Sequence, residues 1–433
     1  MTDNARPEAV TRVLERLGTI TPRLESLYKD LHEHPELSYA ETRTAAVVAA
    51  ELKQLGFTVT EGVGRTGVVG VLSHGEGPRV LLRADFDALP VAEQTGLPYA
   101  STATGVGVDG QEVPVMHACG HDMHVACLLG ALDLLAGARD DWSGTVVAVF
   151  QPAEELGTGA RAMVDDGLFD MAGVPDVVLG QHVAPVPAGI IGCRPGPAMA
   201  GGDTLHVRMF GRGGHGSRPE MTVDPVVMAA STVMRLQTVV SREIAGSETA
   251  VVTVGAINAG TKDNIIPDEA ELKLNIRSFT PEVRTTVMDA VARIVRAEAL
   301  ASGADREPEI ESVASFPVLV NDAHAVERTM GALRTHFGAE SVIDPGVVTG
   351  SEDCGFLATA SGAALCYWFF GGMDPARYLT AAKNGTLGRD IPSNHSPLFA
   401  PVVGPTVDAG VRAMTTAALA WLGQGGSGGP ATS

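Results

Sequence analysis

The chain has 433 residues and a formal net charge of −20, from 51 acidic and 31 basic side chains. Single hydrophobic cores rarely grow beyond roughly 250–300 residues, so two domains are expected. The excess of acidic groups repels phosphate backbones and argues against nucleic acid as a partner.

The sequence is typical of a cytoplasmic protein without a membrane anchor. Its first residues, MTDNARPEAV, mix both charge signs and contain no apolar core segment, so they do not resemble a signal peptide. The sequence contains no apolar run of the ~18 residues that a membrane span needs. The 5 cysteines are spread along the chain and give no disulfide framework. We therefore expect a reduced, cytoplasmic protein with no membrane partner.

Helical and strand patterns alternate through the first part of the chain. Helices are predicted at about 21–31, 41–56 and 125–135. Short apolar runs that are typical of buried strands cover 68–72, 80–82, 146–150 and 176–179. Strands that alternate with helices predict an α/β fold with a mostly parallel sheet covered on both faces.

The middle of the chain has a different pattern, which begins with alternating polar and apolar residues at 204–210. Such alternation is typical of a half-exposed antiparallel strand. The elements predicted after it are a helix at 225–240, strands at 250–256 and 271–278, and a helix at 281–301. This β-α-β-β-α order predicts a smaller α+β domain that is inserted into the larger one.

The boundaries of the insert are predicted in the Gly- and Pro-rich stretch 192–202 and in the region 302–317. The larger domain would then consist of 1–199 and 313–422, and the smaller of 200–312. Residues 423–433 are rich in glycine and predict a flexible tail.

Polar clusters follow the buried strands, which is where ligands bind in open α/β sheets. The clusters are ADFDALP (84–90), HACGHDMH (117–124), QPAEE (151–155) and GQH (180–182), with SNHSP (393–397) in a loop nearer the C-terminus.

Two of these clusters suggest metal chemistry. A single glycine separates Cys119 from His121, so both side chains can reach one point, and both are good zinc ligands. The alternative is a buried free cysteine beside surface histidines. In QPAEE, one carboxylate could bind metal while its neighbour acts as a general base, although paired glutamates also occur in solvated turns. Cys127, by contrast, falls on the apolar stripe of a helix and is expected in the core.

The other polar residues are less specific when each is taken alone. His182 and His395 could each be structural, and Asp85 and Asp87 could orient a ligand or cap a helix. Their joint occurrence after strands favours a shared site.

Taken together, these clusters resemble the M20 metallopeptidase family, and most closely its amidohydrolase branch of hippurate hydrolases, N-acyl amino acid amidohydrolases and auxin-conjugate hydrolases. The matching segments occur in the family's order over nearly the whole chain. They are HEHPELSYAET (32–42), RADFDALP (83–90), HACGHDMH, QPAEE, GQHVAP (180–185), GRGGHGSRPE (211–220), INAGTKDNIIP (257–267), GSEDCG (350–355) and NHSP.

The resemblance implies a pair of divalent ions, Mn²⁺ or Zn²⁺, with Co²⁺ and Ni²⁺ also suited to such ligands. The ligands that it implies are Cys119, shared by both ions, and His121, Glu155, His182 and His395. Glu154 would be the general base that takes a proton from water and passes it to the leaving amine. Asp87 would orient the site, and Asp85 stands where other M20 enzymes carry a ligand histidine.

For the inserted domain, the resemblance implies a lid through which two chains dimerise. His215 would reach the neighbour's active site and stabilise the oxyanion. Asn264 and Arg277 are candidates for binding the substrate's carboxylate or carbonyl oxygen, although Arg277 could equally form a structural ion pair.

The expected function is therefore metal-dependent hydrolysis of N-acyl amino acids, and the small-molecule substrate is the partner that the resemblance implies. Three alternatives stay open. They are an M20-type dipeptidase or aminopeptidase, a thiol hydrolase with Cys119 as nucleophile and His121 as base, and a non-catalytic metal-binding dimer protein. Cys354 replaces an aromatic residue of many relatives, which leaves the acyl group and the amino acid open.

Overall fold

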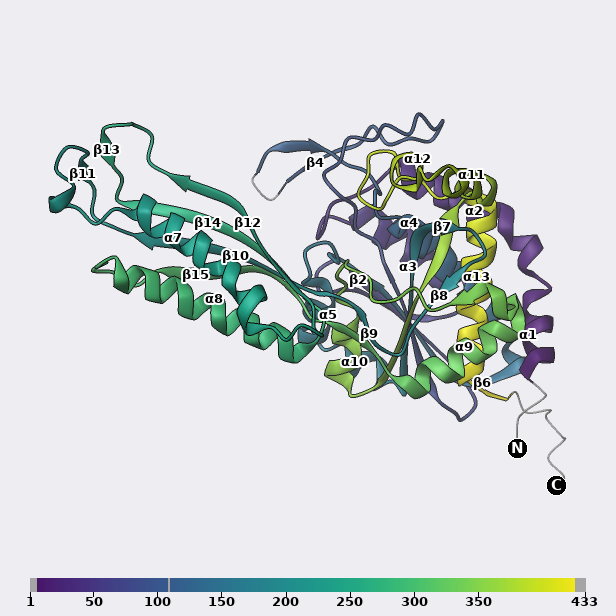
Figure 1. Ribbon diagram of the computed structural model, residues 1–433. Helices are drawn as coiled ribbons and strands as arrows, with labels where there is room; N and C mark the ends of the chain where they lie inside the picture. Colours follow the sequence, from purple (N-terminus) through teal and green to yellow (C-terminus); the bar gives the residue numbers. More distant parts are fainter. Residues whose placement is uncertain (1–5, 108–109, 425–433) are drawn as a thin grey trace, which may run out of the picture. The chain divides into compact units, whose positions relative to one another are not determined.

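The computed structural model describes residues 6–107 and 110–424, which divide into two compact units (Figure 1). The larger unit consists of Met1–Gly196, Val320–Gly346 and Asp353–Ser433. The smaller unit consists of Pro197–Leu319 and Val347–Glu352. The short segment Val347–Glu352 therefore groups with the smaller unit, which no pattern in the sequence indicated.

The larger unit is built on a sheet with the strand order β1-β2-β6-β3-β7-β18-β8-β17. The strands are β1 (Thr58–Val63), β2 (Gly67–His74), β3 (Arg79–Asp85), β6 (Trp142–Gln151), β7 (Val177–Pro187), β8 (Ile191–Gly192), β17 (Val342–Ile343) and β18 (Ala364–Met373). The central strands β6, β3, β7 and β18 pair in parallel, and β1 and β2 add antiparallel strands at one edge. Strands buried on both faces read as continuous apolar runs, which explains VVAVF in β6. The predicted α/β fold is confirmed.

Helix α4 (His121–Gly137) lies at the centre of this unit and is buried along almost its whole length. It packs against α2 (Leu17–Glu33), α13 (Val403–Trp421) and β3. A methyl group at Gly410 of α13 would lie 2.4 Å from Sγ of Cys127, so the two helices touch there. Cys127 is fully buried, which confirms its predicted place in the core.

The remaining helices of the larger unit lie around the sheet, and β4 and β5 form a separate two-stranded hairpin (Figure 1). They are α1 (Arg6–Leu14), α3 (Thr42–Gln54), β4 (Thr104–Val106), β5 (Glu112–Pro114), α5 (Gly159–Asp165), α6 (Leu168–Ala172), α9 (Ala323–Phe337), α10 (Gly355–Ser361), α11 (Pro375–Asn384) and α12 (Leu387–Asp390). Among the described residues, no helix has the length and apolar character that a membrane span requires.

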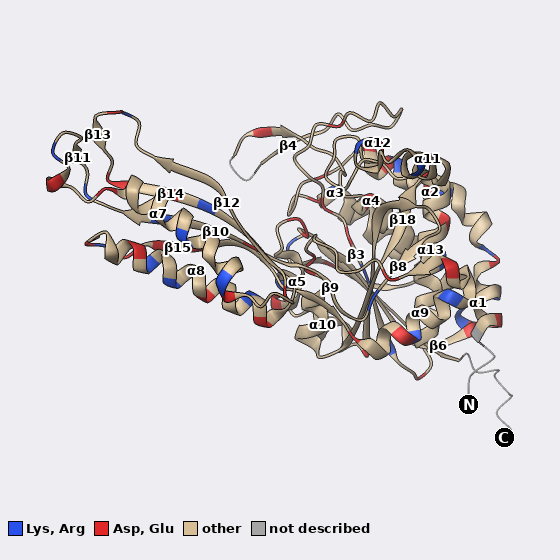
Figure 2. Cartoon of the chain, viewed as in Figure 1, with Lys and Arg blue, Asp and Glu red and all other residues tan. Residues whose placement is uncertain are grey.

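The smaller unit is an antiparallel sheet with two helices on one face. Its strand order is β12-β14-β10-β15, formed by β10 (Gly201–Phe210), β12 (Ala250–Ala259), β14 (Glu269–Ser278) and β15 (Glu309–Phe316). Alternate residues of β10 and β14 are buried under α7 (Pro225–Thr238) and α8 (Pro281–Ala301). Figure 2 shows acidic and basic residues along α8, and its apolar residues are the buried ones, as expected for a half-exposed helix.

Two boundaries differ from the sequence-based expectation. The region 302–317 was predicted as a connection, but it contains β15, which pairs with β10. Most side chains of β15 stay at least partly exposed, so it lacks the apolar run of a buried strand. At the C-terminus, Gly423–Gln424 forms β19 against β6, so these two residues are not part of a flexible tail. The rest of the predicted tail, 425–433, lies outside the described residues.

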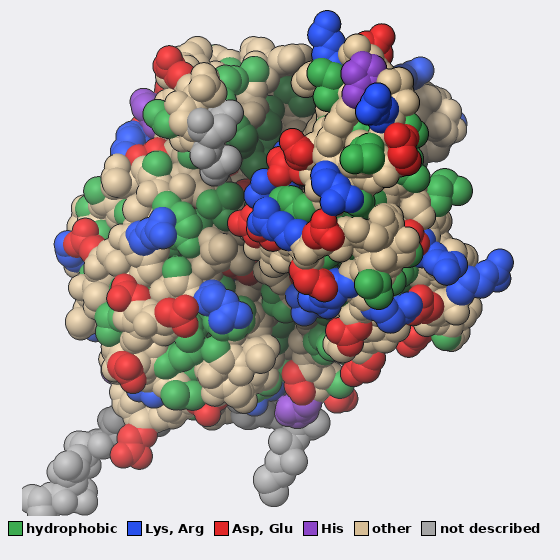
Figure 3. Space-filling model, turned by 90° about the vertical axis from the view of Figure 1, so that its left-hand side faces the viewer, with side chains coloured by type: hydrophobic (Ala, Val, Ile, Leu, Met, Phe, Trp, Pro, Cys, Tyr) green, Lys and Arg blue, Asp and Glu red, His purple; other side chains and the backbone are tan. Residues whose placement is uncertain are grey.

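The surface carries its charge in small, mixed groups. On the face shown in Figure 3, acidic, basic and apolar side chains are interspersed. On that face the charges of both signs are therefore mixed and do not form a large patch of one sign.

Candidate metal centre

A tight glycine turn brings Cys119 and His121 together. Helix α4 begins at His121, four positions earlier than the apolar pattern predicted, so this histidine lies in its first turn. Gly120 has a φ of 82°, and a Cβ there would lie 2.5 Å from Cγ1 of Val183. Only glycine fits such a position. The residue between Cys119 and His121 must therefore be a glycine for this turn to form.

His121 is held through one ring nitrogen and leaves the other without a partner. Its Nδ1 lies 3.2 Å from Oδ1 of Asp87, while its Nε2 is buried and makes no hydrogen bond. Three carboxylates face that nitrogen, with Oδ2 of Asp85 at 3.7 Å, Oε1 of Glu155 at 3.9 Å and Oε2 of Glu154 at 4.0 Å. The gap is too long for hydrogen bonds.

The glutamate pair follows the end of β6 through a strained turn. Ala153 has a φ of 48°, a left-handed conformation that non-glycine residues rarely adopt. The backbone N–H of Glu155 then donates to Oδ2 of Asp87 at 3.1 Å. Asp87 therefore contacts both His121 and the Glu155 backbone, as expected for a residue that orients the site.

His182 lies within β7 rather than at its end. The strand was predicted to stop near Leu179, but β7 continues to Pro187 because it keeps pairing with β18 after β3 has ended. Nδ1 of His182 donates to the Val183 carbonyl at 2.8 Å, and Nε2 lies 3.4 Å from Sγ of Cys119. Burial and the neighbouring His124 lower the pKa of His182 well below its ordinary value, so its Nε2 keeps a free lone pair.

The loop that carries His395 is tied to the same point. His395 has a φ of 69°, and its backbone N–H donates to the Ala118 carbonyl at 2.8 Å. The Asn394 amide donates to the carbonyls of Cys119 and Val183 at 3.1 and 3.2 Å. Nε2 of His395 consequently lies 3.3 Å from Oε1 of Glu155.

These contacts bring the five expected ligands into one cluster. Each of the following triads has its ligand atoms within 4.8 Å of one another: Cys119–His121–His182, Cys119–Glu155–His395 and His121–Glu154–Glu155. Atoms that bind one zinc ion at about 2.0–2.3 Å lie roughly 3–4 Å apart, so the spacing suits bridging by a cation.

The chemistry of the donors also fits metal ions. Buried polar atoms normally have hydrogen-bond partners, yet Nε2 of His121 makes no hydrogen bond, and Oε1 of Glu155 has only its ion-pair contact with His395. Burial and Glu155 raise the pKa of the Cys119 thiol, an effect that a bound cation would reverse. Cysteine, histidine and carboxylate together are a donor set for zinc and similar transition metals.

Two neighbours of the cluster escaped the sequence analysis, namely His124 and Arg83. Nδ1 of His124 lies 2.5 Å from Oδ1 of Asp85, and its Nε2 accepts the Val183 N–H at 2.8 Å. Both of its nitrogens are used, so His124 braces β7 and is not a ligand. The sequence did contain a clue to His124, because it lies three residues after His121 and hence on the same face of the helix.

Arg83 explains why Asp85 is not a ligand either. Its buried guanidinium donates to Oδ2 of Asp85 at 2.6 Å and to the Gln151 side chain at 2.9 Å. Although burial opposes ionisation, Arg83 and two histidines hold the pKa of Asp85 well below its ordinary value. The signal in the sequence was a charged residue inside the apolar run of β3.

The three candidate substrate-binding residues all lie in the smaller unit, and the structure groups two of them. His215 in β11 (Gly214–His215) pairs with Ile265 of β13 (Ile265–Ile266), and Gly216 N–H donates to the Asn264 carbonyl at 2.9 Å. Both side chains are exposed. Arg277 lies apart from them, near the other end of β14, where it donates to Ser351 and Asn275. Within the described residues Arg277 forms no ion pair, so its alternative structural role gains no support.

The ring of His215 has a fixed tautomer. Its Nδ1 accepts hydrogen bonds from the backbone N–H and the hydroxyl of Ser217, at 3.1 and 2.8 Å. The hydrogen of the neutral ring is therefore on Nε2, which makes that atom a donor.

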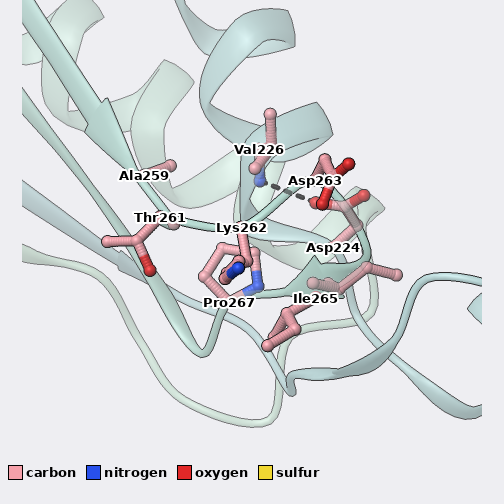
Figure 4. A pocket seen from close by; sticks show the side chains of 10 residues that line it. Asp224, Val226, Ala259, Thr261, Lys262, Asp263, Ile265 and Pro267 are labelled. Atoms are coloured by element: carbon pink, nitrogen blue, oxygen red, sulfur yellow. Dashed lines mark hydrogen bonds between the residues drawn. The ribbon is translucent and has the colours of Figure 1, made fainter.

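A pocket of about 470 Å³ lies next to these residues in the smaller unit (Figure 4). Its lining includes Asp224 at the start of α7 and the loop residues Lys262 and Asp263. Both loop side chains are exposed to solvent, and the carboxylate of Asp224 caps α7 by accepting the backbone N–H of Val226. The pocket therefore adds no titratable group that is held in a buried environment.

Comparison with known proteins agrees with this geometry. The profile of peptidase family M20/M25/M40 matches residues 81–383. The chain is 37% identical over 341 residues to N-acetyl-L-cysteine deacetylase from Bacillus subtilis, covering 78% of each chain. It is 40% identical over 350 residues to thermostable carboxypeptidase 1 from Saccharolobus solfataricus, covering 79% of this chain and 84% of the relative.

A solved structure shares the fold as well. It is a dinuclear metal-binding peptidase of the M20 family from Bacillus subtilis, with a TM-score of 0.71 and 28% identity over 93% of this chain and 98% of that one. The matched profile, the similar sequences and the shared fold show that this chain belongs to peptidase family M20/M25/M40.

Proposed function

We propose that this M20 hydrolase cleaves the amide bond of N-acyl amino acids with the help of two divalent ions. The observation that carries the proposal is the pair of buried atoms without a hydrogen bond, Nε2 of His121 and Oε1 of Glu155, which face each other across 3.9 Å beside Glu154. The ions would be held by Cys119, His121, Glu155, His182 and His395. When bound, they supply Lewis acidity, which polarises a carbonyl oxygen and makes water more acidic.

The protein's own groups divide the remaining work. Glu154 is adjacent to a ligand but is not one of the five, so its carboxylate takes the proton of the attacking water. It then returns that proton to the leaving nitrogen. In the proposed dimer, His215 of one subunit donates its Nε2 hydrogen to the substrate's carbonyl oxygen in the partner's site. Removing such a donor typically raises the barrier by about 2.7–4 kcal/mol.

The substrate class is supported by what two differently named relatives have in common. A deacetylase that acts on N-acetyl-L-cysteine and a carboxypeptidase both release an amino acid with a free α-carboxylate. An N-acyl amino acid and the C-terminal residue of a peptide contain the same bond, and only the acyl side differs. The proposal therefore fixes the leaving group as an amino acid and leaves the acyl pocket to be determined.

Two of the alternatives are less well supported. A dipeptidase or aminopeptidase must also hold a free amine, and neither of the two relatives compared above is named as such an enzyme. A cysteine nucleophile needs a lowered pKa, whereas burial and Glu155 raise the pKa of Cys119.

Amine release from a substrate panel tests the proposal. The panel holds N-acetyl, N-benzoyl and long-chain N-acyl amino acids together with dipeptides. The protein is assayed as purified, after chelation, and after Mn²⁺ or Zn²⁺ is restored. We expect cleavage of acyl amino acids that chelation stops and metal restores. Cleavage of dipeptides alone would favour the dipeptidase, and activity that ignores chelation would contradict the metal mechanism.

Three further points are proposals of the same kind. Mn²⁺ or Zn²⁺ is the expected metal, two copies of the chain are expected to pair through the smaller unit as a lid, and the cytoplasm is the expected location. The first is addressed by metal analysis of the purified protein and the second by its mass in solution.

A further inference from the structure

A carboxylate from the N-terminal part of the chain holds the turn that precedes the glutamate pair. Oε1 of Glu41 accepts the backbone N–H of Ala153 at 2.9 Å, and Oε2 accepts the Thr66 hydroxyl at 2.6 Å. Glu41 is fully buried and forms no ion pair within the described residues. It belongs to the segment HEHPELSYAET, which is far from the ligands in sequence and has no assigned part in the chemistry.

The turn held by Glu41 needs outside support. Ala153 combines a buried methyl group with a φ of 48°, and such backbone conformations persist only where the surroundings impose them. On the other side of Glu154, the backbone N–H of Glu155 donates to the carboxylate of Asp87. Two carboxylates thus fix the backbone on either side of Glu154, one at residue 153 and one at residue 155.

We propose that Glu41 is a positioning residue for Glu154 and Glu155, which it aims by fixing the peptide of Ala153. The inference rests on the proposed function, in which Glu154 is the base and Glu155 a ligand. Glu41 itself touches neither substrate nor ions. Burial and the nearby Asp87 raise the pKa of Glu41 to about 7. The interior therefore disfavours a charged carboxylate at this position.

Hydrogen exchange and metal binding test this role without any substrate. In Glu41→Ala, we expect the amide of residue 153 to exchange at least tenfold faster, because its acceptor is gone. We expect the affinity for Zn²⁺ or Mn²⁺, measured by calorimetric titration of metal-free protein, to fall tenfold or more. With an active substrate, kcat should fall at least tenfold while KM stays within twofold. Glu41→Gln keeps a carbonyl oxygen for the Ala153 N–H and should restore all three values to within threefold.

The matched control is Glu36→Ala. Glu36 is another glutamate of the same segment, and it accepts the backbone N–H groups of Arg43 and Thr44 at the start of α3. Its loss should destabilise α3 and leave exchange at residue 153 and metal affinity unchanged. Should Glu41→Ala fail to fold, Glu41→Asp retracts the same oxygen by one carbon and is measured instead.

Normal exchange at residue 153 and normal metal affinity in a folded Glu41 variant would overturn the proposal. Equal losses in Glu36→Ala would overturn it too, since they would show a general effect of stability. If the wild-type protein cleaves no acyl amino acid, the proposed function fails on its own, and the exchange and metal measurements still decide the role of Glu41.

Discussion

Oδ1 of Asp87 lies 3.2 Å from Nδ1 of His121, and the second nitrogen of that ring is buried without a partner. The carboxylate accepts the Nδ1 hydrogen, so Nε2 is the atom left for a metal ion, and it faces Asp85, Glu154 and Glu155. Although burial opposes the charged ring, Asp85 and Asp87 raise the pKa of His121 well above its ordinary value, so a bound cation would take the place of the Nε2 hydrogen. Such a carboxylate fixes the tautomer and makes a histidine a better metal ligand.

Replacing Asp87 with alanine should therefore weaken metal binding. The change removes the partner of His121 and the acceptor of the Glu155 N–H together. Losses of about 10–100-fold in affinity or activity are typical for such partners of ligands. Competition with a chromophoric chelator measures the affinity. Ser38→Ala, which removes only a hydroxyl that donates to Asp87, is the control and should stay close to wild type. Unchanged affinity in Asp87→Ala would show that His121 needs no such support.

Replacing Glu154 with glutamine should stop turnover while the metal stays bound. The amide has nearly the same shape as the carboxylate but cannot accept the proton of water, and general base catalysis typically contributes about 10²–10⁴-fold. Steady-state kinetics and metal analysis are run on the same sample. Glu155→Gln is the matched comparison, because the loss of a ligand should lower metal content as well. Wild-type kcat in the Glu154 variant would exclude it as the base.

The contact between Ser217 and His215 predicts a graded effect on catalysis. Ser217→Ala removes the hydroxyl donor but leaves the backbone N–H on Nδ1, so the tautomer survives and kcat should fall only a few-fold. His215→Ala removes the Nε2 donor itself, and the loss of one oxyanion donor typically lowers kcat by about 10²–10³-fold. Equal kcat values for both variants and wild type would remove His215 from the reaction.

The buried contact of His32 with Asp122 and Glu93 predicts a pH-dependent stability. Nδ1 of His32 lies 2.6 Å from Asp122, and Nε2 lies 3.2 Å from Glu93. Burial opposes the charged ring, but the attraction of Asp122 and then Glu93 is larger, and the pKa of His32 rises from 6.5 to about 10. Because the folded pKa is the higher one, the contribution to stability is complete below pH 6.5 and disappears as the pH rises towards about 10.

Denaturant unfolding of metal-free protein at several pH values checks this expectation. His32→Gln should lower the free energy of unfolding by about 3–5 kcal/mol near pH 6, as removal of one partner of a buried ion pair typically does. The difference from wild type should shrink steadily towards pH 10. A difference that is constant over this range would mean that the ring is neutral in the folded protein.

The sequence predicted β2, β3, β6 and the first part of β7, because strands buried on both faces leave continuous apolar runs, but it did not predict β1, β8 or β17. It also indicated Cys119, Glu155 and His182, since polar residues directly after or within such runs are unusual. It failed at β15, whose largely exposed side chains carry no apolar period. It also failed at Arg83 and His124, because only the fold brings hydrogen-bond partners such as Gln151 and Val183 close to them.

The roles assigned to these residues have a different basis. Periodicity cannot tell a ligand from a structural histidine, so the five ligands came from the resemblance to the M20 family. The structure brings them into one cluster, and the experiments above are needed to establish what each residue does.

The hydrogen bond from Asn394 to Cys119 joins residues 275 positions apart. During synthesis, Cys119 leaves the ribosome long before His395 does, with the entire smaller unit made in between. The last ligand can reach the cluster only after translation has passed residue 395. Until then the nascent chain displays an incomplete set of the expected donors, so the proposed metal site can be completed only after nearly the whole chain has been made. A chain truncated before Asn394 would lack both His395 and α13, against which α4 packs, so neither the cluster nor the core of the larger unit could be completed.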